Sequence, residues 1–470
     1  MARKARRALT IGFTRANEDR LTTPLLTVVL AAGKGTRMKS ALPKVLHAVA
    51  GRSMLAHVLA LAEAAGSTRT AVVIGPGMDD VRAAIAKAMP QAEVFVQELQ
   101  LGTGDAVKAA LPAITGFEGD VVVLYADTPL TTVDNVARLR GSLAGGNQVA
   151  VLGFEPDDPT GYGRLLTDAS GALTAIREEK DASDDERKVR LCNSGVMGFH
   201  VADLAGVLAR IGNANAKSEY YLTDTIELIR ADGGRAGVVT CAAEDVLGVN
   251  SRDQLAEAEA IWQRRRRLQA MRDGATLISP ETVWFSHDTV VGRDVVIEPN
   301  VFFGPGVTIE DGVEIKANCH IEGAVIGAGA RIGPFARLRP GAALGADVHV
   351  GNFVEVKNVT MGAGAKANHL AYLGDGAVGA KANIGAGTIF CNYDGFFKHR
   401  TIVGEGAFVG SNSALVAPVE IGAGAYVGSG SVITKNVTAG ALALERASQE
   451  ERPGWAEKFR AVMARRKAKA

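Results

Sequence analysis

Residues 291–326 read VGRDVVIEPNVFFGPGVTIEDGVEIKANCHIEGAVI, and a large apolar residue recurs every six positions from Val291 to Ile321, followed by one step of five to Ile326. Neither a helix nor an alternating strand repeats with that period, so the pattern predicts a coil with six residues on each side. A parallel β-helix meets this requirement, because its stacked coils bury one apolar residue per side and glycine permits the tight corner that follows. The same spacing continues through Ile332, Leu338, Leu344, Val350, Val356, and later Val403, Val409, Leu415, Ile421, Val427 and Ile433.

The repeat is interrupted between Phe390 and Val403, where the segment CNYDGFFKHR leaves the pattern. Insertions in repeat proteins tend to map to functional faces, so we expect a loop ejected from the coils at this point to be part of a site.

Composition excludes several classes of function. The chain has 470 residues, 47% of them hydrophobic, and a net charge of +1, so we expect no nucleic-acid partner. Met1–Pro24 lacks the apolar core of a signal peptide, and no segment has the roughly 18 apolar residues that span a bilayer, so we expect no membrane insertion. The cysteines lack metal-finger spacing, which is typical of a reduced, cytoplasmic protein; they are Cys192, Cys241, Cys319 and Cys391.

Upstream of the coils, strand-like and helix-like segments alternate, which predicts an α/β domain with a doubly wound, Rossmann-like parallel sheet. The expected strands are Leu25–Ala31, Thr70–Ile74, Val94–Val96, Val121–Tyr125, Val149–Phe154 and Gly195–His200. The expected helices are Met54–Ala65, Asp79–Met89 and Gly104–Leu111. We therefore divide the chain into a disordered basic extension (1–24), an α/β domain (25–250), a linker helix (251–275), the β-helix (276–440) and a C-terminal tail (441–470).

The first candidate site follows the first strand, where LAAGKGTRM occupies residues 30–38 and is expected to open a helix. Gly33 and Gly35 would let backbone N–H groups approach phosphates, and Lys34 and Arg37 supply positive charge. Met38 stands where a dinucleotide fingerprint has its third glycine, and no Walker A pair is present. Taken alone, this segment is equally compatible with a structural strand–helix turn.

Asp127 follows another strand, at the edge where open α/β sheets bind ligands, and a carboxylate there suits a hard cation such as Mg²⁺. By itself it is equally well explained as a helix cap.

Read in full, LAAGKGTRM followed by LPK at 42–44 resembles the signature of sugar-nucleotide pyrophosphorylases. Further segments match that family in order: QELQLGT (97–103), LYADTP (124–129), TGYGR (160–164), EEKD (178–181), NSG (193–195), EYYLTD (219–224) and GVN (248–250). The one departure is Ala126, where the family usually has glycine.

This resemblance implies in-line displacement at the α-phosphorus of UTP, with charge neutralisation by Mg²⁺ and by Lys44 and Arg37 as catalytic residues. It implies Asp127 and Asn250 as the metal ligands, and Gly163, Glu178 and Asn193 as contacts to an amino sugar. The remaining nucleotide-binding residues that it implies are Leu30, Ala31, Ala32, Gly33, Lys34, Lys44, Gln97, Gly102, Thr103 and Tyr125.

A second candidate site lies on the coils, where charged residues concentrate although a buried β-helix has no need of them. Arg339 and Lys357 could grip a phosphate, Asn392 and Tyr393 could hold a sugar, and His369 could take a proton from an attacking amine. A lone histidine on a repeat surface is more often simply hydrogen-bonded or solvated. A zinc site is disfavoured because the histidines of the repeat are isolated, at His320, His349 and His369.

Six-residue coils resemble the hexapeptide-repeat acyltransferases, whose β-helix is left-handed. Residues 25–455 together resemble the bacterial family of bifunctional N-acetylglucosamine-1-phosphate uridylyltransferases / glucosamine-1-phosphate acetyltransferases. The resemblance implies His369 as general base, with Glu355 helping to orient it, and a homotrimer with acetyl-transfer sites between subunits. Glucosamine 1-phosphate would contact Arg339, Lys357, Tyr372, Asn383, Asn392, Tyr393 and Lys398. Acetyl-CoA would contact Ala386, Asn392, Tyr393, Ser411, Ser429 and Arg446.

Asn368 departs from the smaller residue that relatives commonly have before the base. Two rival hypotheses remain at this point. One is a single-activity pyrophosphorylase with a structural β-helix, and the other is a nonenzymatic trimerisation scaffold. The His369 and Asn392–Tyr393 constellation argues against the first, and the intact cation-binding residues of the α/β domain argue against the second.

Overall fold

The computed structural model of the protein describes residues 23–33 and 35–469. Lys34 and residues 1–22 of the expected extension therefore lie outside the described residues. The chain divides into two compact units, and the boundary falls between Arg265 and Arg266 in helix α10 (Arg252–Arg272). Among the described helices, none is both long and apolar enough to cross a membrane.

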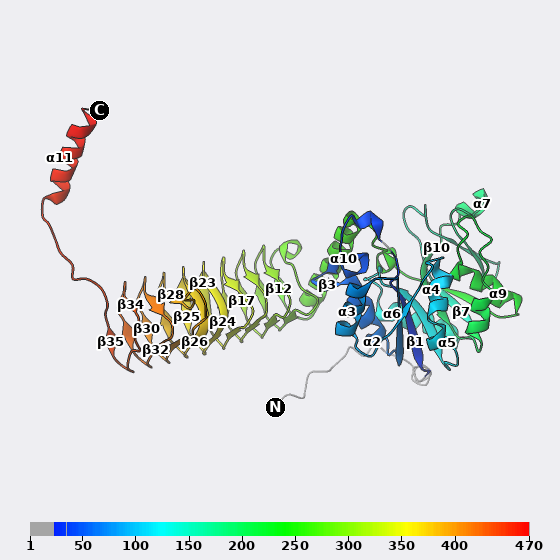
Figure 1. Ribbon diagram of the computed structural model, residues 1–470, viewed down its shortest axis with the longest axis horizontal. Helices are drawn as coiled ribbons and strands as arrows, with labels where there is room; N and C mark the ends of the chain where they lie inside the picture. Colours follow the sequence, from blue (N-terminus) through cyan, green and yellow to red (C-terminus); the bar gives the residue numbers. More distant parts are fainter. Residues whose placement is uncertain (1–22, 34, 470) are drawn as a thin grey trace. The chain divides into compact units, whose positions relative to one another are not determined.

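The first unit is an α/β domain built around one large sheet (Figure 1). Its strands are β1 (Leu25–Leu30), β2 (Ala48–Val49), β3 (Arg52–Ser53), β4 (Arg69–Ile74), β5 (Glu93–Val96), β6 (Asp120–Tyr125), β7 (Val149–Phe154), β8 (Arg164–Thr167), β9 (Leu173–Arg177), β10 (Cys192–Phe199) and β11 (Ala236–Thr240). Its α-helices are α2 (Met54–Ala64), α3 (Asp79–Ala88), α4 (Thr103–Ala109), α5 (Leu111–Ile114), α6 (Val133–Ala144), α7 (Asp184–Arg187), α8 (Leu204–Ala209) and α9 (Thr225–Ala231). Short 3-10 turns are η1 (Thr36–Met38), η2 (Lys44–Leu46), η3 (Leu222–Asp224) and η4 (Ala243–Val246).

Strand β1 lies inside this sheet, whose order is β11-β7-β10-β6-β1-β4-β5. All six residues of β1 are buried, which explains its continuous apolar run. Leu26 and Val28 pack into a core shared with α4, α8 and α9, whereas Leu25 and Val29 pack on the other face with α2, α3 and α6. Helices thus cover both faces, as predicted for a doubly wound fold.

The sheet is mixed rather than parallel, which corrects the sequence prediction. β10 runs antiparallel to both β6 and β7 and separates them. It follows the antiparallel β8–β9 pair instead of a crossover helix, so the chain re-enters the sheet in the opposite direction.

Two predicted helices are also shorter than expected. After β1 only the 3-10 turn η1 forms, because Gly35 and Lys39 on either side of it adopt left-handed conformations (φ 62° and 48°) that stop an α-helix from propagating. The helix expected over Gly104–Leu111 ends at Ala109, and α5, with proline in its first turn, begins at Leu111.

The second unit is a left-handed parallel β-helix, as the six-residue repeat and its resemblance predict. Its first strands are β12 (Thr276–Leu277), β13 (Val290–Val291), β14 (Val296–Ile297), β15 (Phe302–Phe303), β16 (Thr308–Ile309), β17 (Glu314–Ile315), β18 (His320–Ile321), β19 (Ala324–Ile326), β20 (Arg331–Ile332), β21 (Arg337–Leu338), β22 (Ala342–Leu344) and β23 (His349–Asn352), with η5 (Pro280–Thr282) between β12 and β13. The later strands are β24 (Glu355–Met361), β25 (Lys366–His369), β26 (Tyr372–Val378), β27 (Asn383–Ile384), β28 (Ile389–Cys391), β29 (Thr401–Val403), β30 (Phe408–Val409), β31 (Ala414–Val416), β32 (Val419–Ile421), β33 (Tyr426–Val427), β34 (Val432–Ile433) and β35 (Leu442–Ala443), and the tail contains α11 (Trp455–Lys467).

Each coil stacks directly on the next through parallel strand pairs (Figure 1). The periodic apolar residues point inward, and Ile332, Leu338 and Val356 have no exposed surface. Glycines lie at places where one coil approaches the next most closely. A Cβ added at Gly404 would lie 2.5 Å from the backbone nitrogen of Ala423 in the following coil.

We predict that Gly404→Ala lowers the thermal unfolding midpoint of the β-helix, because the added methyl must push two backbones apart at a cost of about 1–3 kcal/mol. Gly406→Ala is the matched control: that residue has a φ of 63° but nothing within 4 Å of its Cβ position. Gly406→Ala should lower the free energy of unfolding only by the strain of a left-handed alanine, about 1 kcal/mol. Calorimetry that finds the control the more damaging variant would contradict this packing argument.

Candidate functional site

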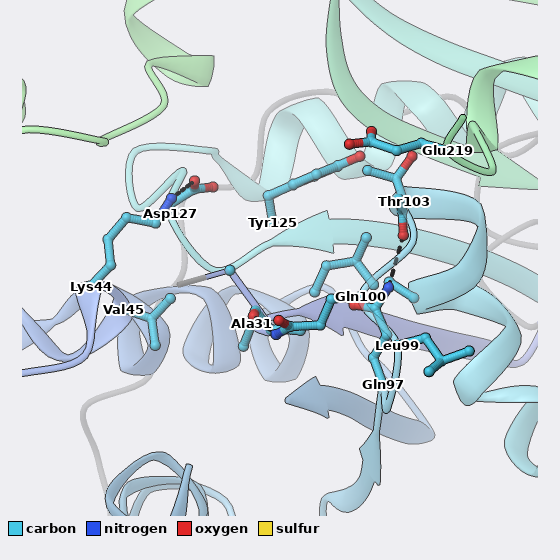
Figure 2. A pocket seen from close by; sticks show the side chains of 15 residues that line it. Ala31, Lys44, Val45, Gln97, Leu99, Gln100, Thr103, Tyr125, Asp127 and Glu219 are labelled. Carbon is cyan, nitrogen blue, oxygen red and sulfur yellow. Dashed lines mark hydrogen bonds and ion pairs between the residues drawn. The ribbon is translucent and has the colours of Figure 1, made fainter. Parts of the chain in front are cut away.

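A pocket of about 460 Å³ opens in the first unit at the carboxyl ends of β1 and β6 (Figure 2). Of the predicted nucleotide-binding residues it is lined by Leu30, Ala31, Ala32, Gly33, Lys44, Gln97, Gly102, Thr103, Tyr125 and Asp127. The residues in its lining that we did not assign are Val45, Leu99, Gln100, Ala106 and Glu219. Leu99, Gln100 and Glu219 lie inside motifs quoted above, so only their individual roles were missed.

Lys44 brings the two predicted metal ligands together. Its Nζ donates to Asp127 Oδ2 at 2.5 Å and to Asn250 Oδ1 at 3.0 Å, and the residue is only 9% exposed. The Asn250 N–H donates in turn to Gln254 Oε1 at 2.8 Å, at the start of α10. Two oxygens from distant segments therefore converge on one positive charge. Among the described residues no cluster of three or more His, Cys, Asp or Glu gathers as a metal site.

The segment after β5 is fixed around the pocket by its amides. Gln97 Nε2 donates to the Gly102 carbonyl at 2.9 Å and to Asp105 Oδ2 at 2.8 Å. Gln100 Nε2 donates to the Ala32 carbonyl at 2.6 Å and so ties this segment to the turn after β1. A planar base edge entering the pocket would meet amide groups whose positions are already set.

Tyr125 lines the pocket, and Figure 2 shows its ring pointing toward Thr103 and Glu219. Burial raises the pKa of its phenol far above the ordinary value, and the charges of Asp127 and Glu178 raise it further. A Cβ at Gly195 would lie 2.7 Å from the Tyr125 ring, so glycine is required there for the ring to occupy this position.

The three predicted sugar contacts lie together. The Asn193 N–H donates to the Gly163 carbonyl at 2.8 Å, and a Cβ at Gly163 would lie 3.3 Å from Glu178 Oε1. Burial raises the pKa of the Glu178 carboxyl, and the nearby acidic residue Asp181 adds to that effect while Lys217 opposes it.

Arg164 supports the positions of these three residues through buried contacts. Its side chain is 2% exposed, pairs with Glu179 at 2.9 Å and donates to the carbonyls of Tyr162 and Arg187. It therefore connects the residues that flank Gly163 and Glu178 in the sequence.

Other predictions have different outcomes. Arg37 is exposed and does not line the pocket, and Lys34 lies outside the described residues. Ala126 is fully buried in the core of the first unit, so its methyl group packs against the core and leaves the pocket wall unchanged.

In the second unit, His369 is exposed and its Nδ1 lies 2.8 Å from Asn352 Oδ1. Because the amide oxygen only accepts, Nδ1 carries the proton and Nε2 is left as the acceptor that a general base needs. We expected Glu355 to orient the base. Its Oε1 instead accepts from Arg339 Nη1 at 2.8 Å, and its Oε2 lies 3.6 Å from Arg337 Nη1. The residue that holds the His369 ring is thus Asn352, to which the sequence analysis assigned no role.

His369 belongs to a column that runs along one corner of the coils. Backbone N–H groups in successive coils link this corner: Leu370 donates to Asn352, Gly387 to His369, Asn412 to Ala386 and Gly430 to Ser411. Arg446 Nη1 donates to the Ser429 carbonyl at 2.8 Å. The corner therefore aligns His369 with all four residues assigned to acetyl-CoA alone, Ala386, Ser411, Ser429 and Arg446. Asn383 lies on the side that leads into this corner.

The predicted phosphate and sugar residues gather at the next corner. Asn392 Nδ2 donates to Asp375 Oδ2 at 2.5 Å, and Lys398 Nζ lies 4.0 Å from the same oxygen. A hydrogen bond with Lys398, together with burial, lowers the pKa of Lys357. A Cβ at Gly374 would lie 2.5 Å from Tyr372 Oη and 2.8 Å from Asn392 Nδ2, so both side chains meet over this glycine. Asp375 was not predicted.

The ejected loop begins at Asn392 and is internally ordered. Asp394 Oδ1 accepts from the N–H groups of Phe396 and Phe397 at 2.8 and 2.7 Å, and Asp394 Oδ2 lies 2.7 Å from His399 Nε2. The bond to His399 lowers the pKa of the Asp394 carboxyl to about 2. Tyr393 Oη donates to the Gly395 carbonyl at 2.6 Å.

Comparison with known proteins matches both units. Residues 27–189 match the family described as MobA-like NTP transferase domain, and residues 288–323, 323–358 and 400–435 match the bacterial transferase hexapeptide repeat. Proteins described as bifunctional protein GlmU are similar over nearly their whole length. The one from Azorhizobium caulinodans is 60% identical over 93% of this chain and 98% of its own. Those from Xanthobacter autotrophicus and Rhizorhabdus wittichii are 59% and 60% identical over 94% and 95% of this chain and 99% and 98% of their own.

We predict that Arg164→Met destabilises the first unit by about 3 kcal/mol, because it leaves Glu179 and two carbonyls without their buried partner. Chemical unfolding measures this change. Arg210→Met is the control, since Arg210 forms an ion pair with Asp232 but is 45% exposed, and it should cost less than about 1 kcal/mol. Equal effects of the two variants would show that Arg164 does not hold the sugar-side residues.

Proposed function

This chain belongs to the family of bifunctional GlmU proteins, and from that premise we propose how its residues divide two reactions between them. It is an enzyme of UDP-N-acetylglucosamine biosynthesis. The second unit transfers the acetyl group of acetyl-CoA to glucosamine 1-phosphate. The first unit transfers the uridylyl group of UTP to N-acetylglucosamine 1-phosphate and releases pyrophosphate. One observation carries the assignment: a strand-end nucleotide pocket and an oriented histidine on hexapeptide coils occur in the same chain.

In the first unit, UTP occupies the pocket with its base against the Gln97–Gly102 segment and its phosphates against the Gly33 turn. Lys44 and Arg37 supply positive charge to the phosphates, and Lys34 adds to it. Gly163, Glu178 and Asn193 hold the amino sugar so that its phosphate oxygen attacks the α-phosphorus in line, with pyrophosphate as leaving group. Most of the catalysis is then positioning and charge neutralisation.

We assign Mg²⁺ to Asp127 and Asn250. Carboxylate and amide oxygens are donors that Mg²⁺ accepts, and these two already meet at the positive charge of Lys44 Nζ. When bound, the ion would neutralise charge on the phosphates of UTP. The chain's own contribution is to keep both oxygens directed at that point and to keep the Lys44 ammonium beside them.

In the second unit, His369 Nε2 takes a proton from the amine of glucosamine 1-phosphate as the amine attacks the thioester carbonyl, and Asn352 keeps the histidine in the tautomer that this requires. The carbon–sulfur bond then breaks, and the CoA thiolate leaves and takes up that proton. Arg339, Lys357 and Lys398 bind the phosphate. Arg339 Nε supports this role, because it is buried without an acceptor among the described residues. Tyr372, Asn383, Asn392 and Tyr393 hold the sugar, and the column of Ala386, Ser411, Ser429 and Arg446, with Asn392 and Tyr393, contacts acetyl-CoA.

We further propose a homotrimer. The left-handed φ values of Leu370 (52°) and Asp375 (52°) mark two successive corners of a coil, so one side of the coil separates the base from the phosphate cluster. A small sugar phosphate can meet both groups if the histidine corner of one subunit faces the phosphate corner of another. The unpaired cysteines at Cys192, Cys241, Cys319 and Cys391 support a reducing, cytoplasmic location.

The product assay that tests both activities combines purified protein with glucosamine 1-phosphate, acetyl-CoA, UTP and Mg²⁺. We expect mass spectrometry to detect UDP-N-acetylglucosamine, and to detect none when acetyl-CoA is omitted. Product that forms only from supplied N-acetylglucosamine 1-phosphate would instead favour a pyrophosphorylase with a structural β-helix.

Two variants should separate the activities. We expect His369→Ala to lose acetyl transfer by at least about 100-fold, because the base is removed, while uridylyl transfer stays at the wild-type rate. Asp127→Ala should lose uridylyl transfer while acetyl transfer stays at the wild-type rate. Equal loss of both activities in the His369 variant, or full uridylyl transfer in the Asp127 variant, would remove these residues from their assigned sites.

Sedimentation equilibrium should give a mass three times that of the 49.0 kDa chain. A monomer that retains full acetyl transfer would contradict sites shared between subunits.

A further inference from the structure

Asp375 is a buried carboxylate at the corner where the predicted phosphate and sugar residues gather, and it has no role in the assignment above. It is 8% exposed, although it lies on the repeat surface of the coils, and its φ is 52°. Asp and Asn are the residues other than glycine that adopt this left-handed conformation most readily. The conformation explains the residue type at the corner, but it does not explain why the carboxylate is buried.

Both oxygens of Asp375 accept from an amide. Asn392 Nδ2 donates to Oδ2 at 2.5 Å, and Asn358 Nδ2 donates to Oδ1 at 2.8 Å. Asn392 is 5% exposed and begins the ejected loop, whereas Asn358 is exposed. A carboxylate only accepts hydrogen bonds, so the NH₂ group of Asn392 must face Asp375. The carbonyl oxygen of Asn392 lies in the same amide plane and is then directed away from Asp375.

Asp375 is also the negative group beside a set of cations. Lys398 Nζ lies 4.0 Å from Oδ2, and Lys357 is close enough to affect its ionisation. Burial by itself would raise the pKa of the Asp375 carboxyl, but the hydrogen bonds from Asn358 and Asn392 and the two lysine charges outweigh it and lower the pKa. The group is therefore ionised at neutral pH, and it stays an acceptor.

We propose that Asp375 is a positioning residue for acetyl transfer: it fixes the amide of Asn392 so that the carbonyl oxygen, and not the NH₂ group, faces the amino sugar. An acceptor at that place can hold an N–H or O–H of the sugar, whereas a reversed amide would present a donor to the attacking amine. This inference rests on the proposed acetyltransferase function of the second unit. The contact with Lys398 is secondary, because at 4.0 Å the two groups attract each other without a close hydrogen bond.

The test variant is Asp375→Gly, which keeps the left-handed backbone and removes both acceptor oxygens. We expect kcat/KM for acetyl transfer to fall about 10- to 100-fold, the range for losing a hydrogen bond to a charged group. Uridylyl transfer by the same protein should be unchanged, which shows that the first unit is folded, and a wild-type thermal unfolding transition of the β-helix shows the same for the second unit. Asp347→Gly is the matched control, since Asp347 is an exposed aspartate at another corner of the coils with a φ of 55°, and it should retain wild-type acetyl transfer.

A double-mutant cycle distinguishes positioning from a general structural role. If Asp375 acts through Asn392, Asp375→Gly should cause less than about a twofold further loss in an Asn392→Ala background, because the side chain that it orients is already gone. In a Ser429→Ala background the two losses should multiply, since Ser429 lies on the other corner. Multiplied losses with Asn392→Ala, or wild-type acetyl transfer in Asp375→Gly, would overturn the proposal.

Asp375→Ala keeps the inference testable if the glycine variant does not fold. It also removes both acceptor oxygens, so acetyl transfer should fall as it does in the glycine variant, and its cycle with Asn392→Ala replaces the first. Asp375→Asn keeps one amide oxygen that can accept from Asn392 while the exposed Asn358 turns, so this variant should recover most of the activity. Wild type and His369→Ala are assayed alongside. A wild-type protein without acetyl transfer contradicts the proposed function itself. An active wild type, an inactive His369→Ala and a fully active Asp375→Gly or Asp375→Ala contradict only the role of Asp375.

Discussion

The stacking of one coil on the next constrains everything that the second unit does. Parallel backbone hydrogen bonds place each coil over its neighbour, so residues at matching positions form columns along the corners. Glycines such as Gly404 permit this close approach, because a Cβ there would meet the backbone of the next coil at 2.5 Å. This register alone places residues as distant in sequence as Asn352, His369, Ser411 and Ser429 in one column. The proposed chemistry is therefore distributed by corner, with the assigned base and acetyl-CoA residues at one corner and the assigned phosphate residues at the next.

Periodicity and motif order predicted much of this from the sequence, because both are local or nearly local signals. The six-residue repeat predicted the coils, and the interruption after Phe390 predicted the ejected loop. What the sequence could not give was pairing between distant segments. The antiparallel entry of β10 depends on the β8–β9 pair, and the early end of the helix after β1 depends on the left-handed conformations of Gly35 and Lys39. Asn352 and Asp375 were missed for the same reason, since each is defined by a partner 17 residues away in the next coil.

In both proposed sites a carboxylate lies beside a lysine to which we assign a phosphate. Asp127 holds Lys44 at 2.5 Å, and Asp375 lies 4.0 Å from Lys398. Holding the cation before the substrate arrives reduces the reorganisation that binding requires, which is how positioned charges contribute most to phosphoryl chemistry. The two pairs differ in burial, since Lys44 is 9% exposed and Lys398 is 51% exposed.

That difference in burial follows from what each site has to do. In the first unit the phosphates themselves react, so the cation and its carboxylate lie inside a pocket where a low dielectric strengthens their effect on the transferring group. In the second unit the phosphate does not react and only anchors the substrate. The reacting atom is the amine, which in the proposed mechanism must reach His369 at another corner. A more exposed lysine on an ordered loop can bind such a phosphate, because its charge has to fix the position of the substrate and does not have to stabilise a transition state. The stricter requirement at that site falls on Asn392, whose orientation depends on a buried acceptor beside it.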